Sequence, residues 1–211
     1  MKIRWIGHAS FQIETAEGIR VRTDPYDDSI GLPVSSLPAD VVTVSHGHFD
    51  HNATALVPDK PVVVDSPGRH TAKGIQFNGV PTYHDEAHGA KRGRNIVFVM
   101  LADGLTLAHL GDLGHVPDEE QAAAIGKVDI IMVPVGGVYT LDAAGAARVT
   151  DTLKPKIVIP MHYKIPGLGV GVGGVEPFLV GRKDIRRLDQ LTVEKAELPE
   201  GPEVVVLMPR P

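Results

Sequence analysis

The stretch 46–51, His-Gly-His-Phe-Asp-His, places three histidines and an aspartate within six residues. Imidazole and carboxylate groups are common ligands of zinc and of similar divalent metals. The stretch follows the apolar, β-branched run 41–44, which is typical of a buried strand, so the four side chains belong to the loop at its end. A polar surface loop with solvated histidines is the alternative, but four ligand-type residues in so short a loop favour a metal site.

This cluster resembles the His-x-His-x-Asp-His signature of the metallo-β-lactamase fold superfamily, and all four defined positions are filled. The resemblance continues, in the order of the superfamily, through a histidine after the run 75–83, Gly111-Asp112 and the segment 160–163, Pro-Met-His-Tyr. It implies one metal site of His46, His48 and His84, a second of Asp50, His51 and His162, and Asp112 as the bridge between them. His88 remains the alternative to His84 as the third histidine ligand.

The resemblance also implies residues that support the ligands. Asp24, in a Thr-Asp-Pro corner, would lie under the metal site and orient a metal-bound histidine, although a turn residue before proline is the alternative. His8 interrupts the first expected strand and is either another such supporting residue or a satisfied buried histidine. Arg92, Arg94 and Lys164 are candidates for an anion-binding rim, against the alternative of solvated surface charges.

Short strands must position these loops, because apolar runs alternate with Gly and Pro throughout the chain. Strands are expected at 2–14 with one interruption, 19–23, 41–45, 61–65, 75–83, 95–102, 105–110, 128–135, 157–163, 191–196 and 203–208. Helices are expected at 118–125, 141–153 and 176–188, with a helical turn at 68–73. The irregular loop 26–39 could form a wall of the cleft, and the glycine-rich loop 167–174 is either a substrate lid or a surface loop. The resemblance implies an α/β fold, a four-layer αββα sandwich, with residues 1–211 as a single domain.

Composition narrows the classes of function. The chain of 211 residues has no cysteine, which excludes disulfides and thiolate ligands from it. A net charge of −5 argues against broad attraction to nucleic acid. No apolar run reaches the roughly 18 residues that a membrane span needs, and no signal peptide is visible. These features favour a cytoplasmic protein with a small-molecule substrate; they do not define its oligomeric state.

Three short motifs add a resemblance to a narrower group within the superfamily. Gly-His-Ala-Ser-Phe at 7–11, Thr-Asp-Pro at 23–25 and Pro-Met-His-Tyr at 160–163 are similar to a small bacterial branch of the superfamily. That branch includes ascorbate-6-phosphate lactonase-type proteins and the N-acyl-phosphatidylethanolamine phospholipase. Most of its bacterial members are described only as metal-dependent hydrolases, so the branch does not define a substrate.

The expected function is that of a dinuclear metal-dependent hydrolase, which uses a metal-bridging hydroxide on a small anionic ester, lactone or phosphodiester. Two divalent ions are implied, Zn²⁺ first and Mn²⁺ or Fe²⁺ as alternatives, with Asp50 and Asp112 as catalytic carboxylates. No Gly-x-Ser-x-Gly motif offers a serine nucleophile. The alternatives are a di-iron redox protein of the flavodiiron type, which usually has a flavin domain, and a non-catalytic metal-binding or regulatory module.

Overall fold

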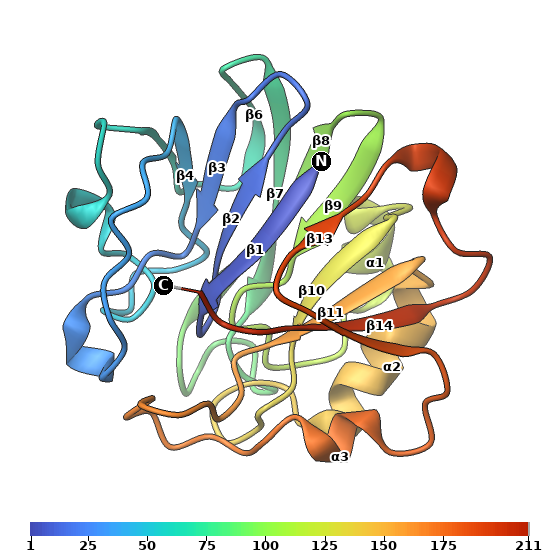
Figure 1. Ribbon diagram of the computed structural model, residues 1–211. Helices are drawn as coiled ribbons and strands as arrows, with labels where there is room; N and C mark the ends of the chain where they lie inside the picture. Colours follow the sequence, from blue (N-terminus) through green and yellow to red (C-terminus); the bar gives the residue numbers. More distant parts are fainter. Residues whose placement is uncertain (211) are drawn as a thin grey trace.

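The computed structural model describes residues 1–210, which form two β-sheets, three α-helices and short 3₁₀ turns (Figure 1). The first sheet has the order β13 (Leu191–Thr192), β1 (Lys2–Gly7), β2 (Ser10–Glu14), β3 (Arg20–Thr23), β4 (Val41–Thr43) and β5 (Val62–Val64). The second has the order β12 (Ile185–Leu188), β14 (Glu203–Leu207), β11 (Ile157–Met161), β10 (Ile130–Pro134), β9 (Leu105–His109), β8 (Arg94–Ala102), β7 (Ile75–Tyr83) and β6 (Gly68–Ala72).

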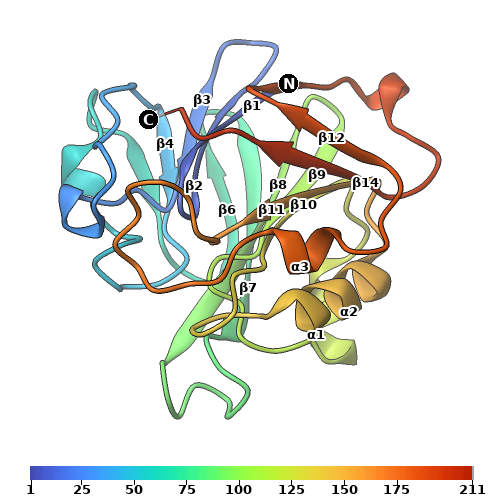
Figure 2. The same ribbon diagram turned by 60° about the horizontal axis from the view of Figure 1, so that its bottom comes forward.

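The helices lie beside the second sheet. They are α1 (Glu119–Ile125), α2 (Ala143–Leu153) and α3 (Glu176–Leu179), and Figures 1 and 2 show them grouped near β10 and β11, away from the first sheet. A capping box between Asp118 and Gln121 starts α1, and the Asp142 carboxylate accepts the Gly145 N–H at the start of α2. These caps satisfy backbone donors that have no partner within the helix.

The core fills the space between the two sheets. Trp5, Phe11 and Phe98 are among the largest fully buried side chains and belong to one apolar cluster that includes residues of both sheets. The ring of Trp5 packs against Tyr163 with 4.9 Å between their centroids. Two facing sheets, with helices outside the second, confirm the expected α/β sandwich; the single-domain assignment stays a prediction. No helix within residues 1–210 is both long and apolar enough to cross a membrane.

Strand direction gathers the candidate ligands at one edge of this sandwich. The strands β9, β10 and β11 are mutually parallel, and β7 runs in their direction because both β7 and β9 are antiparallel to β8. In the first sheet, β3 and β4 are also parallel. Parallel strands deliver their carboxyl ends to the same edge of a sheet, so the loops after β7, β9 and β11 lie close together.

Two expected helical segments are strands instead. In the expected helical turn 68–73, residues 68–72 form β6, paired antiparallel with β7. The expected helix 176–188 ends after four residues at Leu179, and residues 185–188 pair as β12 with β14. Gly181 between them has a φ of 78°, which breaks the helix, and pairing beside β14 outweighs the local helical pattern.

The expected strand at 61–65 is present as β5, but it is less buried than its sequence suggested. It lies at the edge of the first sheet, where Val62 and Val63 are 44% and 42% exposed. The expected loop 26–39 covers the outer face of this sheet: Arg22 donates to the Leu37 carbonyl at 3.2 Å, and Gln12 donates to the Pro38 carbonyl at 3.0 Å.

Candidate metal centre

The Asp112 carboxylate lies at the centre of the histidine cluster. Its Oδ2 atom is 3.0 Å from His84 Nε2, 3.3 Å from both His51 Nε2 and His162 Nε2, and 3.9 Å from His46 Nε2. The side chain is 2% exposed. One carboxylate surrounded by imidazole nitrogens from several loops has the arrangement expected of a group between two cations.

The ligand-type atoms divide into two main groups around this carboxylate. His46, His48 and His84 form one group, and Asp50, His51, His162 and His8 form the other, with the ligand-type atoms of each group within 4.8 Å of one another. A third possible group, Asp24, His46 and His51, shares two of these histidines. The structure therefore brings all seven residues of the expected ligand set together and adds His8 beside the second group.

The residues present fit a pair of divalent cations. Nitrogen ligands of a tetrahedral zinc ion are about 3.3 Å apart, given Zn–N bonds of about 2.0–2.1 Å. His46 Nε2 and His48 Nδ1 are 3.0 Å apart, close to that separation. In addition, His51 Nε2 and Asp112 Oδ1 are buried without a hydrogen-bond partner within residues 1–210. Bound cations would satisfy these atoms, which are costly to leave unpaired.

His84, and not His88, points into this cluster. The His84 side chain is buried and approaches Asp112, whereas His88 is exposed and packs edge-on against the Tyr83 ring with 5.3 Å between centroids. The last residue of β7 is Tyr83, so His84 is carried directly by the strand end while His88 lies further out in the loop. The placement favours His84 as the third histidine ligand of the first group.

Asp24 supports both groups from beneath. Its Oδ2 atom accepts from His51 Nδ1 at 2.9 Å and from the Ser45 hydroxyl at 2.5 Å, and its Oδ1 atom accepts the Ser45 N–H at 2.8 Å. The Ser45 Oγ atom is in turn 2.9 Å from His46 Nδ1. One buried carboxylate thus orients two histidines, one directly and one through a serine that the sequence analysis did not single out.

The electrostatics follow from this burial. Burial lowers the pKa of His46 to about 3, so its imidazole is neutral at pH 7, the form that binds metal. Burial also acts to lower the pKa of His51, but the carboxylates of Asp112 and Asp24 raise it well above its ordinary value. The pKa of Asp24 is lowered on balance, because His109 and His51 outweigh the burial that acts to raise it. Two buried carboxylates therefore keep negative charge beneath the site.

His8 is bound to the second group through Asp50. Its Nε2 atom lies 3.1 Å from Asp50 Oδ2, and its ring packs against His162 with 4.1 Å between centroids. Its backbone has a φ of 53°, and its carbonyl accepts from both Trp5 Nε1 and the His162 N–H. These contacts fix the interruption between β1 and β2 and place the His8 ring against Asp50 and His162.

Asn95 and two glycines hold the Asp112 turn in place. Asn95 Oδ1 accepts the Asp112 N–H at 2.9 Å, and its Nδ2 donates to the Leu110 carbonyl at 3.0 Å. A Cβ atom on Gly111 would lie 2.4 Å from Asn95 Oδ1. Gly114 lies equally close to the loop after β7, because a Cβ atom on Gly114 would be 2.4 Å from the backbone nitrogen of Asp85. Asn95 carried no sequence signal beyond its place at a strand start.

We expect Gly114→Ala to lower the free energy of unfolding by about 1–3 kcal/mol, because the added methyl group must displace backbone. It should also weaken metal binding, since the turn that carries Asp112 would move away from His84. Gly47→Ala is the matched control: Gly47 lies in the His46–His51 loop, and a Cβ atom there would meet nothing within 4 Å. Urea unfolding and zinc titration of both variants measure the difference; equal stability would contradict the close approach.

A cavity of about 520 Å³ opens above the histidine cluster. It is lined by Ser29, Ile30, His48, Phe49, Asp50, His84, Arg92, Asp112, Tyr139, His162, Gly169, Val170 and Gly171. Of the three candidate anion-binding residues, only Arg92 is in this wall. Arg94 begins β8 as an exposed residue, and Lys164 donates its Nζ protons to the Leu168 carbonyl, so neither lines the cavity.

The two loops predicted to form the cleft meet at one side of this cavity. Ile30 accepts the Gly169 N–H at 2.7 Å, and the Gly173 N–H donates to Gly136 at 2.8 Å. In Figure 1 the orange loop after β11 reaches the blue turn that contains Ile30. Gly31 must be glycine here, because its φ is 82° and a Cβ atom would lie 2.5 Å from the Gly167 carbonyl. The glycine-rich loop therefore forms part of the cavity wall.

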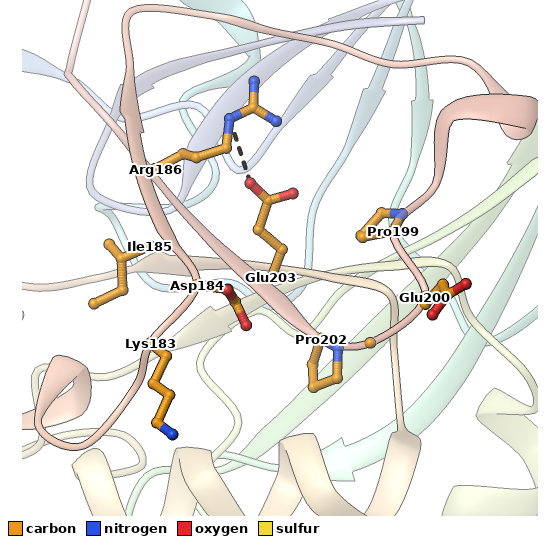
Figure 3. Close-up of a pocket in the computed structure, with 9 residues that line it drawn as sticks. Lys183, Asp184, Ile185, Arg186, Pro199, Glu200, Pro202 and Glu203 are labelled. Carbon is orange, nitrogen blue, oxygen red and sulfur yellow. Dashed lines mark ion pairs between the residues drawn. The ribbon is translucent and has the colours of Figure 1, made fainter.

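A second hollow lies at the opposite end of the second sheet, between β12 and the turn before β14 (Figure 3). Its volume is about 690 Å³, and an ion pair of 3.3 Å joins Arg186 and Glu203 across it. All its lining residues are exposed or half-buried, and none belongs to a cluster of metal-type ligands. The cavity above Asp112, and not this hollow, is therefore the one lined by metal-type ligands.

Known proteins resemble this chain over most of its length. Residues 2–162 match the family model described as Beta-lactamase superfamily domain. A UPF0173 metal-dependent hydrolase of Pyrobaculum neutrophilum is 32% identical over 192 residues, which cover 77% of this chain and 84% of the relative. Another, of Carboxydothermus hydrogenoformans, is 31% identical over 205 residues, which cover 82% and 89%. A solved Thermotoga maritima structure, assigned as a Zn-dependent hydrolase of the metallo-β-lactamase superfamily, has a TM-score of 0.83 and 41% identity, covering 98% of this chain and 97% of that one.

Proposed function

Because the chain belongs to the metallo-β-lactamase superfamily, and with it to the metal-dependent hydrolases, we propose that it holds two divalent ions and hydrolyses a small anionic ester, lactone or phosphodiester. The observation that carries this proposal is the division of the ligand-type side chains into two groups on either side of Asp112. A structural metal site would need only one closed set of four ligands. Two partial sets that share a carboxylate and open into a cavity favour catalysis.

In this proposal His46, His48 and His84 hold one ion, Asp50, His51 and His162 hold the other, and Asp112 bridges them. Zinc is the first candidate for both ions, because its usual nitrogen ligand is neutral imidazole and its usual oxygen ligand is carboxylate. Mn²⁺ and Fe²⁺ are compatible with the same residues. When bound, such a pair supplies an activated water and polarises the attacked carbonyl or phosphoryl oxygen.

The protein's own residues orient and protect this chemistry. Asp24 fixes His51 directly and His46 through Ser45, so both imidazoles present Nε2 to the cavity side. Asp50 Oδ2 accepts a hydrogen bond from His8, whose pKa is lowered to about 4 by burial and by His162. A neutral His8 can donate at Nε2, which would hold the Asp50 carboxylate in one orientation for binding an ion through its other oxygen.

The test is a comparison of His48→Ala with wild-type enzyme, in metal content and in turnover on lactones, thioesters and bis-p-nitrophenyl phosphate. We expect the variant to lose at least one ion per chain. Its kcat/KM should fall by more than about 100-fold. Loss of a residue that only hydrogen-bonds a metal ligand lowers activity by about 10- to 100-fold. His88→Ala is the matched control, since His88 is an exposed histidine outside the cluster. Undiminished turnover and two bound ions in His48→Ala would overturn the proposal.

A further inference from the structure

We propose that the substrate is a monoanionic amphiphile, whose apolar body lies against Phe49 and Tyr139 and whose anionic group binds the Arg92 guanidinium, remote from the bond that is cleaved. This inference rests on the proposed function and names the substrate class of the same site. It follows from three features of the cavity wall: one cation without a carboxylate partner, the rigid loop that presents it, and an exposed apolar rim.

Arg92 is a cation in the cavity wall with no acidic partner within residues 1–210. Its Nη2 donates to the Val138 carbonyl at 3.2 Å, and its guanidinium carbon lies 5.6 Å from the centroid of the Tyr139 ring. The neighbouring Lys91 is different, because its ammonium is paired with Glu86. A guanidinium has five N–H donors in a planar fork, so most of those of Arg92 remain for a ligand.

Asp85 fixes the loop that carries this cation. Its two carboxylate oxygens accept four backbone N–H groups at 2.7–3.0 Å, including that of Arg92 itself. The loop is thus held by its own buried anion, and the Arg92 side chain starts from a fixed backbone. A preorganised group loses less entropy when it binds a ligand.

The cavity mouth is apolar. Phe49 is 59% exposed and Tyr139 41% exposed, and both line the cavity; Val138 beside them is 64% exposed. Ile30 and Val170 extend the apolar lining inward. Exposed apolar side chains that gather around a cavity are typical of a ligand-binding site. A volume of about 520 Å³ is that of a site for one small molecule, which fits a short apolar body with one charge.

The arrangement separates the two ends of the ligand. Asp112 is 2% exposed, whereas Arg92 is half-buried and Tyr139 is 41% exposed, so within the lining of this cavity the Asp112 carboxylate is more deeply buried than the cation and the aromatic ring. In this proposal the scissile group lies beside Asp112, and a different group of the substrate meets the Arg92 guanidinium. The cation therefore recognises a second, non-reacting anion on the substrate, and the apolar rim covers the part between them.

Two matched esters test this inference on metal-loaded enzyme: mono-4-nitrophenyl adipate, which carries a terminal carboxylate, and 4-nitrophenyl hexanoate, which is neutral and of equal chain length. We expect Arg92→Gln to raise KM for the adipate about 10- to 100-fold, the range for a lost hydrogen bond to a charged group. KM for the hexanoate should change less than about threefold. Arg94→Gln is the matched control, because Arg94 lies two residues away outside the cavity wall and should change neither value. Equal effects of Arg92→Gln on both esters, or none, would overturn the inference.

A binding measurement separates this inference from the proposed function. Calorimetry of 5-phenylpentanoate and of the neutral 5-phenylpentanol, with wild-type enzyme, Arg92→Gln and Tyr139→Ala, needs no turnover. We expect Arg92→Gln to weaken only the carboxylate and Tyr139→Ala to weaken both ligands. If no ester is hydrolysed but this pattern appears, the proposed function fails and the binding site stands. If the carboxylate binds equally well to Arg92→Gln, it binds elsewhere, and the inference fails whatever the enzyme hydrolyses.

Discussion

Asp112→Asn is expected to abolish hydrolysis, with kcat/KM lowered by about 10³-fold or more, because metal-ion catalysis supplies several kcal/mol of transition-state stabilisation. The substitution keeps the volume and the backbone N–H bond to Asn95, but it removes the negative charge that faces His51, His84 and His162. An amide offers one weak oxygen ligand where the carboxylate offers two charged ones. Metal per chain, measured by mass spectrometry, should fall from two ions to one or none.

The same variant separates a bridging role from a general electrostatic one. Chelation should lower the melting temperature of the wild type, since a ligand that binds only the native state stabilises it by mass action. It should change Asp112→Asn much less, because that variant has less metal to lose. Asp118→Asn is the control, since asparagine caps a helix as well as aspartate does at the start of α1. Two ions per chain in Asp112→Asn would show that this carboxylate is not the bridge.

Asp24→Ala is expected to lower the free energy of unfolding of the metal-free protein by about 3–5 kcal/mol, the range for breaking a buried ionic network. Asp24 is fully buried, and its loss leaves His51 Nδ1 and both donors of Ser45 without their acceptor. Its φ of 36° adds strain, because alanine tolerates the left-handed region less well than aspartate or asparagine. Urea unfolding at pH 7 measures the difference.

Two controls divide that effect into its parts. Asp59 is an exposed aspartate with a φ of 69°, and its 3.5 Å ion pair with Arg20 lies at the surface, where it contributes little, so Asp59→Ala reports mainly the backbone strain. Asp24→Asn keeps the backbone, but its single amide oxygen cannot replace both carboxylate oxygens, of which one accepts the Ser45 N–H and the other accepts from the Ser45 hydroxyl and His51. We expect a loss of about 1–3 kcal/mol. Zinc affinity of Asp24→Asn should fall about 10- to 100-fold, as for other partners of metal-bound histidines. Unchanged zinc affinity would contradict the role of Asp24 in orienting the ligands.

The pH for this experiment follows from the pKa of Asp24. That pKa is lowered on folding, so the contribution of the carboxylate is complete above its unfolded value of about 4 and is lost as the pH falls below it. At pH 7 the full contribution is present. The difference between Asp24→Asn and wild type should therefore shrink only in acid.

Local patterns in the sequence predicted the residues that can act and the elements that carry them. The β-branched run before His46, and the runs before Asp112 and His162, each form a strand that ends one to three residues before the candidate ligand. The Asp103-Gly104 turn between β8 and β9 was equally readable. These features depend on side-chain alternation and turn residues within a few positions of one another, which is information that the sequence contains directly.

Only the tertiary structure decided which distant residues meet. Ser45 and Asn95 acquire their roles from partners on other loops, and nothing in their local sequence distinguishes them from ordinary polar residues. The same holds for Arg92 and Lys164, which the sequence analysis grouped together although only Arg92 lines the cavity. Segment 185–188 is a strand because β14 lies beside it, against its own helical pattern.

The cluster at 46–51 illustrates this division. Its composition alone indicated a metal site, because few other roles require histidine, histidine, aspartate and histidine in one loop. It did not contain the information that His48 joins His84 while Asp50 joins His162 and His8, nor that Asp112 stands between the two groups. Those contacts depend on strand order and direction in two sheets, which arise from packing between residues far apart in the sequence, such as His8 and His162.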